Sequence, residues 1–262
     1  MEEAIFISRP GGLRHFSGRH KRIYFGNEFC QRLIPSFGDI DIVADFAAEN
    51  NVPLTIVTPF VTDEGLRALK YMLAYATGND PGLEIVVNDW GVMSFVKDEL
   101  GCQNLVLGRL LTKQKRGPRI LNLKGRVPES MMGHFMESAC DTEVFSDFLV
   151  RNNVGRVEFD NLLQGLIRPG GHIRGSLYYP YAYVSTTRYC LTASCLSAEP
   201  AMRSIASCDK ECGQFSFSLS HKSMPVELIM KGNTQFFENT ELPGNLEELN
   251  IDRLVYQPDI PM

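Results

Sequence analysis

The sequence predicts an α/β fold, a single-domain TIM-barrel-like β/α barrel that is incomplete at its C-terminal end. Short apolar runs alternate with amphipathic helical segments along the first 110 of the 262 residues, and this alternation is typical of a parallel sheet with crossover helices. Four strand–helix units fit in that stretch, a spacing that gives about eight units in a full barrel of roughly 250 residues. We therefore expect one domain over residues 1–262, with an irregular insertion around 113–140.

The individual elements follow from apolar periodicity and from residues that start or stop a helix. Thr62 is expected to cap a helix that stops near Gly78, because a hydroxyl group can accept from free backbone N–H groups. Strands are predicted at 22–26, 53–60, 83–87, 104–107, 154–159 and 173–179, with the last two strands at 226–231 and 253–256. Helices are predicted at 39–50, 62–78, 90–100, 131–136 and 141–151.

Composition excludes several classes of protein. The net charge of −5 and the isoelectric point near 5.6 argue against a broad nucleic-acid-binding surface. No apolar run reaches the length of about 18 to 20 residues that a membrane span requires, and the acidic N-terminus is unlike a signal peptide. We therefore expect a cytoplasmic protein, in which seven cysteines favour metal binding over disulfides.

Three of these cysteines form a C-x12-C-x3-C set: Cys195, Cys208 and Cys212. They lie in a loop-like stretch, and thiolates bind iron well on a flexible segment whose amides can hydrogen-bond to sulfur. A four-iron cluster usually takes four ligands. Cys30 follows the strand at 22–26, and loops after parallel strands converge on one face of a barrel. The predicted ligands are therefore Cys30, Cys195, Cys208 and Cys212.

Two other interpretations of the cysteines stay open. Four thiolates also suit a structural zinc ion. Free cysteines are often buried as small hydrophobic residues, which suits Cys102 and Cys140 better than the set above. Cys190 adjoins an apolar-aromatic run and could replace one of the four ligands.

Three segments resemble the collagenase-like peptidase family U-32: 24–30 (YFGNEFC), 87–92 (VNDWGV) and 105–109 (LVLGR). The cysteine spacing, with a further cysteine after the first strand, is similar to the UbiV branch of that family. In that branch the corresponding cysteines ligate a [4Fe–4S] cluster, so the resemblance implies this cofactor and favours iron over zinc. The resemblance covers most of the chain but is thin between about 112 and 156.

The resemblance implies a barrel-like fold and no protease activity, despite the family's name. UbiV-like proteins act with a homologous UbiU-like iron–sulfur partner in oxygen-independent hydroxylation during ubiquinone biosynthesis, so we expect such a heterodimer and a small aromatic or anionic substrate. Other relatives hydroxylate transfer or ribosomal RNA, and the family is linked to prephenate as hydroxyl donor. An RNA hydroxylation factor is therefore one alternative, and a non-catalytic scaffold stapled by metal is another.

The chain departs from the family pattern in three ways. The region 113–140 looks like an insertion relative to UbiV-like chains. The usual helix after the last strand is missing, or is supplied by a partner. The extra C-terminal domain of the RNA-modifying members is also missing, so RNA is the less favoured substrate.

Several polar residues are candidates for substrate binding. Arg109 directly follows a predicted strand, and an arginine fork matches a carboxylate in two places. Lys113 and Arg116 lie in the basic segment after that strand, where barrel sites form, although solvated loop charge explains them equally well. Asn88 and Asp89 could act in the site, but helix capping explains both as well.

Overall fold

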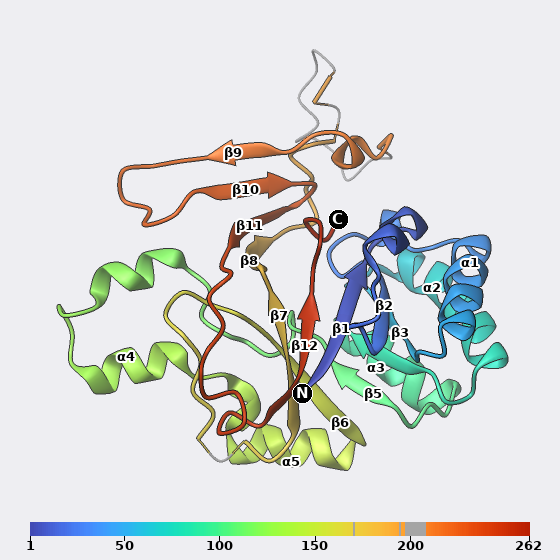
Figure 1. Cartoon of the computed structure of the whole chain (residues 1–262), viewed down its shortest axis with the longest axis horizontal. Coiled ribbons are helices and arrows are strands. Elements are labelled where there is room, and N and C mark those ends of the chain that lie inside the picture. Colours follow the sequence, from blue (N-terminus) through green and yellow to red (C-terminus); the bar gives the residue numbers. More distant parts are fainter. Residues whose placement is uncertain (170, 194, 197–207) are drawn as a thin grey trace.

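The computed structural model describes residues 1–169, 171–193, 195–196 and 208–262. Eight parallel strands close into a barrel in which β12 lies between β7 and β1 (Figure 1). The predicted TIM-barrel-like α/β fold is therefore confirmed. The barrel strands are β1 (Glu2–Ile7), β2 (Arg22–Gly26), β3 (Leu54–Val57), β4 (Glu84–Val87), β5 (Leu105–Leu107), β6 (Val154–Asp160), β7 (Arg174–Tyr179) and β12 (Ile251–Tyr256).

Helices lie outside the barrel and follow several of its strands (Figure 1). The predicted helices are present with small shifts of their ends. The α-helices are α1 (Phe37–Glu49), α2 (Asp63–Asn79), α3 (Trp90–Ser94), α4 (Glu129–Met136) and α5 (Glu143–Arg151). A π-helical turn, η3 (Phe95–Glu99), extends α3. Short 3-10 helices are η1 (Pro10–His15), η2 (Gln31–Leu33), η4 (Pro118–Leu123), η5 (Ala139–Asp141) and η7 (Glu211–Gly213).

Polar side chains cap the helices where the sequence predicts a start. The Thr62 hydroxyl accepts a hydrogen bond from the Gly65 N–H at the beginning of α2. Ser36 and Asp39 form a reciprocal capping box at the beginning of α1. Each cap satisfies backbone donors that have no partner inside the helix, and so fixes where the helix begins relative to the preceding strand.

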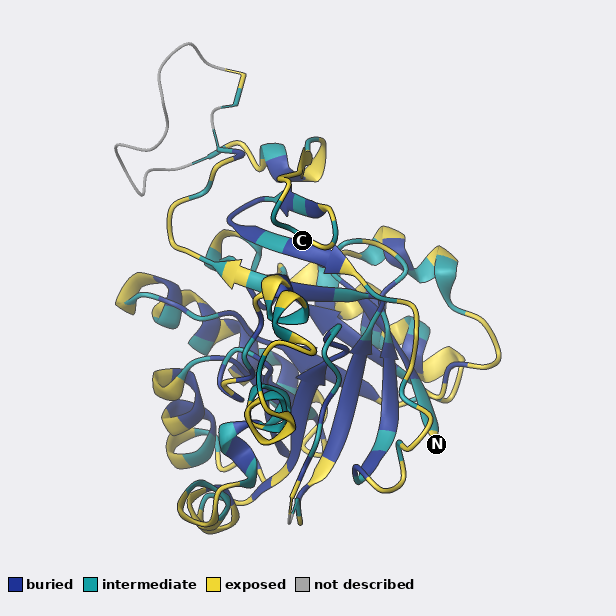
Figure 2. Ribbon diagram, turned by 90° about the vertical axis from the view of Figure 1, so that its left-hand side faces the viewer, coloured by how far each residue is buried: buried dark blue, intermediate teal, exposed yellow. Residues whose placement is uncertain are grey.

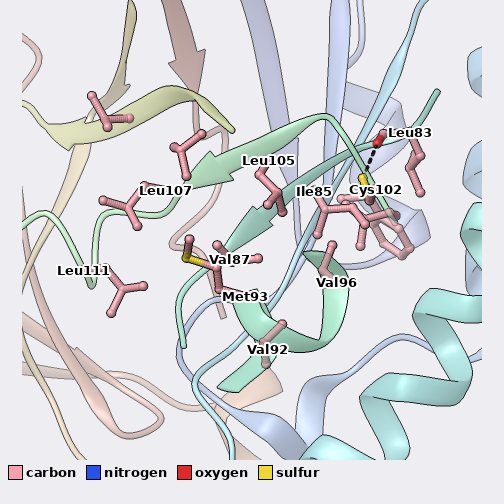
Figure 3. Packing of buried hydrophobic residues seen from close by; sticks show 14 of the residues in the cluster. Leu83, Ile85, Val87, Val92, Met93, Val96, Cys102, Leu105, Leu107 and Leu111 are labelled. Atoms are coloured by element: carbon pink, nitrogen blue, oxygen red, sulfur yellow. Dashed lines mark hydrogen bonds between the residues drawn. The ribbon is translucent and has the colours of Figure 1, made fainter. Parts of the chain in front are cut away.

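The main hydrophobic core fills the space between the barrel and its helices, so the strands are buried on both faces (Figure 2). Figure 3 shows the part of this core in which β4 and β5 pack against α3. Cys102 belongs to it, and its thiol donates to the Leu83 carbonyl over 3.5 Å. Cys140 is also buried, with 2% of its surface exposed. Both cysteines therefore behave as small core residues, as the sequence suggests.

A second sheet of four antiparallel strands covers the carboxyl ends of the barrel strands (Figure 1). It arises from the long connection between β7 and β12. Its order is β8 (Tyr181–Thr186), β11 (Thr234–Glu238), β10 (Leu228–Lys231) and β9 (Phe217–Leu219).

Two strand predictions require correction. The run at 226–231 forms β10 of the second sheet rather than a barrel strand, because an apolar pattern does not reveal which neighbour a strand pairs with. The first barrel strand is β1, whose apolar run follows two acidic residues and was not predicted. Cys30 therefore follows the second barrel strand and Arg109 the fifth.

The region predicted as an irregular insertion, 113–140, contains η4 and α4 and reaches η5. Residues 257–262 follow β12 without forming a helix. Among the helices that the structure describes, none has the length and apolar character needed to cross a bilayer.

Candidate functional site

The carboxyl ends of the barrel strands lie under the second sheet, and a buried ion cluster closes the centre of this mouth. Arg109, which follows β5, has no exposed surface. Its guanidinium group donates to Glu28 Oε2 over 2.6 Å and to Asp160 Oδ1 over 2.6 Å. Arg116 also pairs with Asp160, from the opposite side of the carboxylate. Two buried acids thus face two arginines, which makes the cluster neutral overall.

Aromatic rings pack against both arginines of the cluster. The Arg109 guanidinium carbon lies 4.2 Å from the ring centre of Tyr178, a residue of the barrel interior. Tyr183 of β8 donates its hydroxyl hydrogen to the Arg109 carbonyl over 3.1 Å, and its ring lies 3.8 Å from the Arg116 guanidinium. The cluster therefore joins the barrel interior to the second sheet.

These contacts determine what the predicted substrate-binding arginines can do. Burial disfavours the charged form of Arg109, but the charges of Asp160 and Glu28 outweigh this and raise its pKa. Its fork is already occupied by two carboxylates, so it is not free to bind a substrate carboxylate. Arg116 is likewise engaged, whereas Lys113 is exposed to solvent. The basic segment is therefore not one continuous binding patch.

Asn88 and Asp89 make structural contacts at the end of β4. Asp89 accepts from the N–H groups of Gly91 and Val92 and so caps α3. Asn88 is buried, donates to the Thr58 carbonyl over 3.0 Å and accepts from the Leu110 N–H. The bonds of Asp89 agree with the capping interpretation. Those of Asn88 hold together the loops that follow neighbouring strands.

A group of thiols lies to one side of the ion cluster. Burial raises the pKa of Cys30, and the charges of Cys190 and Cys208 raise it further. Burial raises the pKa of Cys212 to about 11, again with contributions from Cys190, Cys30 and Cys208. Cys30 packs against the buried cluster that contains Cys212, although the two residues are some 180 positions apart in sequence. Cys190 and Cys208 lie close enough for their charges to raise the pKa of both.

The turn between β10 and β11 holds this thiol group in place. The side-chain amide of Asn233 donates to the Phe29 carbonyl over 2.7 Å and to the Thr187 carbonyl over 2.5 Å. It therefore ties the loop that carries Cys30 to the segment that leads to Cys190. The preceding residue, Gly232, has a positive φ of 61° and lies against Cys212, whose Cβ is 3.5 Å from where a side chain at Gly232 would begin.

Cys195 lies beside this group in sequence, and its N–H donates to the Thr192 carbonyl over 3.2 Å. Residues 194 and 197–207, which flank it, are outside the described residues, so its role as a ligand stays a prediction. Within the described ranges, no set of three or more His, Cys, Asp or Glu side chains has its donor atoms arranged to hold a metal ion.

These cysteines are nevertheless of the right chemical type to ligate a metal ion or an iron–sulfur cluster. Cys30, Cys190, Cys208 and Cys212 are all free thiols. Cys212 lies in η7 and Cys30 packs against the same cluster, outside the barrel interior. Their protons would have to be released on binding, because thiolates are the ligating form, and such binding is often coupled to ordering of the site.

Sequence analysis missed several residues that build this site: Glu28, Asp160, Tyr183 and Asn233. Glu28 and Asp160 each lie just after or at the end of a barrel strand, which is a usable signal because the loops after strands meet at one face. The Gly232-Asn233 pair between two apolar runs is a recognisable hairpin turn. Its contact with the loop at Phe29 joins residues 204 apart and has no local signal.

Two cavities open beside the thiol group. One of about 330 Å³ lies where the chain leaves β1 and β12, and its lining includes Arg9, Lys231 and Met262. The other, of about 230 Å³, is lined in part by Arg9, Cys212 and Met262. The ion cluster closes the centre of the mouth, and these two lateral cavities offer space for a small molecule near Cys212.

Two solved structures that match this chain differ in how closely they resemble it. The U32 peptidase Mk0906 superposes with a TM-score of 0.51 at 11% identity, over 100% of this chain and 94% of that one. The two chains share a fold. The chitooligosaccharide complex of YKL-39 covers 98% of this chain and 92% of that one, at 8% identity and a TM-score of 0.32, too weak a likeness to bear on fold or function. No family model matches the sequence, and no curated protein sequence matches it either.

Proposed function

We propose that this chain is an iron–sulfur protein of the U-32 family, closest to its UbiV-type branch, that holds one [4Fe–4S] cluster through Cys30, Cys195, Cys208 and Cys212. The observation that supports the proposal is that Cys30 packs against the buried cluster containing Cys212 beside the barrel mouth, close enough to Cys208 for its charge to raise the pKa of both thiols. The fold shared with a U32 peptidase supports the family assignment.

The surroundings of Cys30 suit a cluster ligand. Its N–H donates to the Asn27 side chain over 2.9 Å, and its carbonyl accepts from the Leu33 N–H. These two bonds fix the backbone of Cys30. They do not involve its side chain, whose thiol can therefore ligate a metal. A cluster with four thiolate ligands has no open coordination position and supplies one-electron transfer. The chain's own residues would therefore bind and shield it.

The wider role follows from the family resemblance. We propose that the chain is a component of oxygen-independent hydroxylation of the ubiquinone-biosynthesis type, working in the cytoplasm with a homologous UbiU-like iron–sulfur protein. Protease activity is not part of this proposal. The burial of Arg116 in an ion cluster weighs against the RNA alternative, because that alternative relies on the basic segment being available to phosphates.

The fourth ligand can be identified by single substitutions. We expect Cys195→Ser to lower the iron content of anaerobically prepared protein as strongly as Cys208→Ser does. Cys102→Ala, which alters a buried core thiol, is the matched control and should leave the iron content unchanged. If Cys190→Ser removes iron and Cys195→Ser does not, the fourth ligand is Cys190 and the proposed set is wrong in that member.

The hydroxylation role can be tested in anaerobic cells of a bacterium that lacks its own UbiV-type protein. Expression of this chain with a UbiU-like partner should restore ubiquinone, whereas the Cys212→Ser variant should not. Unchanged ubiquinone levels with an iron-loaded protein and its partner present would contradict the role. A zinc-loaded protein that binds the partner without turnover would instead identify a scaffold.

A further inference from the structure

The cavity of about 330 Å³ beside β1 and β12 falls within the size range of small-molecule sites in proteins. Its wall is formed by chain segments that leave barrel strands and by the second sheet. Ser8 and Arg9 follow β1, Pro258 and Asp259 follow β12, and Lys231 ends β10. The cavity therefore lies at the carboxyl-terminal face, where sites in barrels of this type form.

The side-chain charges of this cavity are unbalanced. Three cationic side chains line it, those of Arg9, Arg14 and Lys231, against one carboxylate, that of Asp259. Asp259 faces Arg14 over 3.8 Å and His15 over 3.5 Å. Among the described residues, no carboxylate lies within salt-bridge distance of Arg9 or Lys231. Asp259 also acts electrostatically on Lys231, but one side-chain carboxylate does not balance three cationic side chains, and this excess of positive charge favours the binding of an anion.

The neighbouring cavity of about 230 Å³ lies between these cationic side chains and Cys212. The two cavities share Ser8, Arg9, Gly213 and Met262. The second one adds Cys212 and one side chain of each charge, Lys210 and Asp39. Arg9 thus lies between the anion-favouring cavity and the thiol of Cys212. A molecule held by Arg9 would be placed directly beside the candidate cluster ligands.

We propose that this cavity binds a small organic anion, one carrying carboxylate or phosphate groups, through the guanidinium group of Arg9 and the ammonium group of Lys231. An arginine fork can bind either group with two parallel hydrogen bonds, and a lysine adds a point charge. The binding itself is independent of any metal. That the bound anion takes part in the chemistry of the neighbouring thiols rests on the proposed function.

Calorimetric titration with malonate and, separately, with inorganic phosphate tests the binding. We expect saturable one-site binding to at least one probe, with a dissociation constant of about 1 mM or tighter. Arg9→Gln and Lys231→Gln should each weaken it by about tenfold. Lys124→Gln removes an exposed charge outside the cavity and is the matched control, which should bind as the parent does. Binding to malonate alone assigns the site to carboxylates, and binding to phosphate alone assigns it to phosphate esters.

Two results would overturn the proposal: no saturable binding of either probe, or equal weakening by Lys124→Gln and Arg9→Gln. Repeating the titration on Cys30→Ser protein separates this inference from the proposed function. If the parent protein contains no iron but the anion binds and depends on Arg9, the cavity proposal stands and the cluster proposal fails. If iron is present and no anion binds, the reverse holds.

Discussion

Arg109 carries the contacts that close the barrel mouth. It joins Glu28 from the loop after β2 to Asp160 at the end of β6, and all three side chains are fully buried. Loss of one partner from a buried ion pair leaves an uncompensated charge, which is far more costly than the pair is stabilising. Arg109 therefore acts as a structural residue rather than as a substrate ligand.

We predict that Arg109→Gln lowers the free energy of unfolding by about 3–5 kcal/mol, because Glu28 loses its counter-charge and Asp160 keeps only Arg116. Chemical denaturation measures this change. Arg67→Gln, on the exposed face of α2, is the matched control and should change stability by no more than about 0.5 kcal/mol. Equal, small effects of the two substitutions would show that the cluster does not hold the mouth together.

Glu158, inside the barrel, makes the stability of the fold depend on pH. It is fully buried, it accepts from the Tyr178 hydroxyl over 2.7 Å, and its other oxygen has no partner among the described residues. Burial raises its pKa from 4.5 to about 8. Between these two pH values the folded chain keeps a proton that the unfolded chain has released, so this group makes the fold less stable as pH rises through that window.

We predict that Glu158→Gln flattens this part of the pH profile, because glutamine does not ionise. Denaturation midpoints measured from about pH 5 to pH 8 should fall less steeply for the variant than for the parent protein. An unchanged slope would mean that the carboxyl group is not protonated in the folded chain.

At the scale of elements, the β10–β11 turn is the link between the second sheet and the barrel loops. Asn233 bonds to both the Phe29 and the Thr187 carbonyl groups, so one side chain fixes two segments that carry candidate ligands. The same turn places Gly232 against Cys212. The second sheet therefore does more than cover the barrel: it positions three of the thiols relative to one another.

We predict that Asn233→Ala destabilises the fold by about 1–3 kcal/mol, because two carbonyl groups lose a buried donor. It should also lower the iron retained per chain, since the loop that carries Cys30 is no longer tied to the turn. Asn245→Ala, at an exposed position, is the control for both measurements. If Asn233→Ala loses stability but keeps its full iron content, the turn does not position the cluster ligands.

Local sequence signals predicted the elements well but not their partners. The Thr62 cap, the range of α2 and most barrel strands follow from residues that lie close to one another in sequence. In contrast, Arg109 was correctly placed after a strand, yet its partners Glu28 and Asp160 lie 81 and 51 residues away. Pairing over such distances depends on barrel closure, which no local pattern records, and for the same reason β10 was assigned to the wrong sheet.

At the scale of the whole molecule, barrel closure brings the loop after β2 next to the long connection between β7 and β12. The ion cluster closes the axis of the barrel, and the thiols and cavities lie to the side of it. The candidate chemistry is therefore confined to the edge of the mouth, between the ends of β1, β2 and β12 and the second sheet.

Metal analysis tests most directly whether the thiols at this edge hold an iron–sulfur cluster. Protein purified without oxygen should be brown and contain about four iron and four sulfide ions per chain, with little zinc. Cys30→Ser should lose most of that iron, whereas Cys102→Ala should keep it. Colourless, iron-free parent protein, or iron that persists undiminished in Cys30→Ser, would contradict the account.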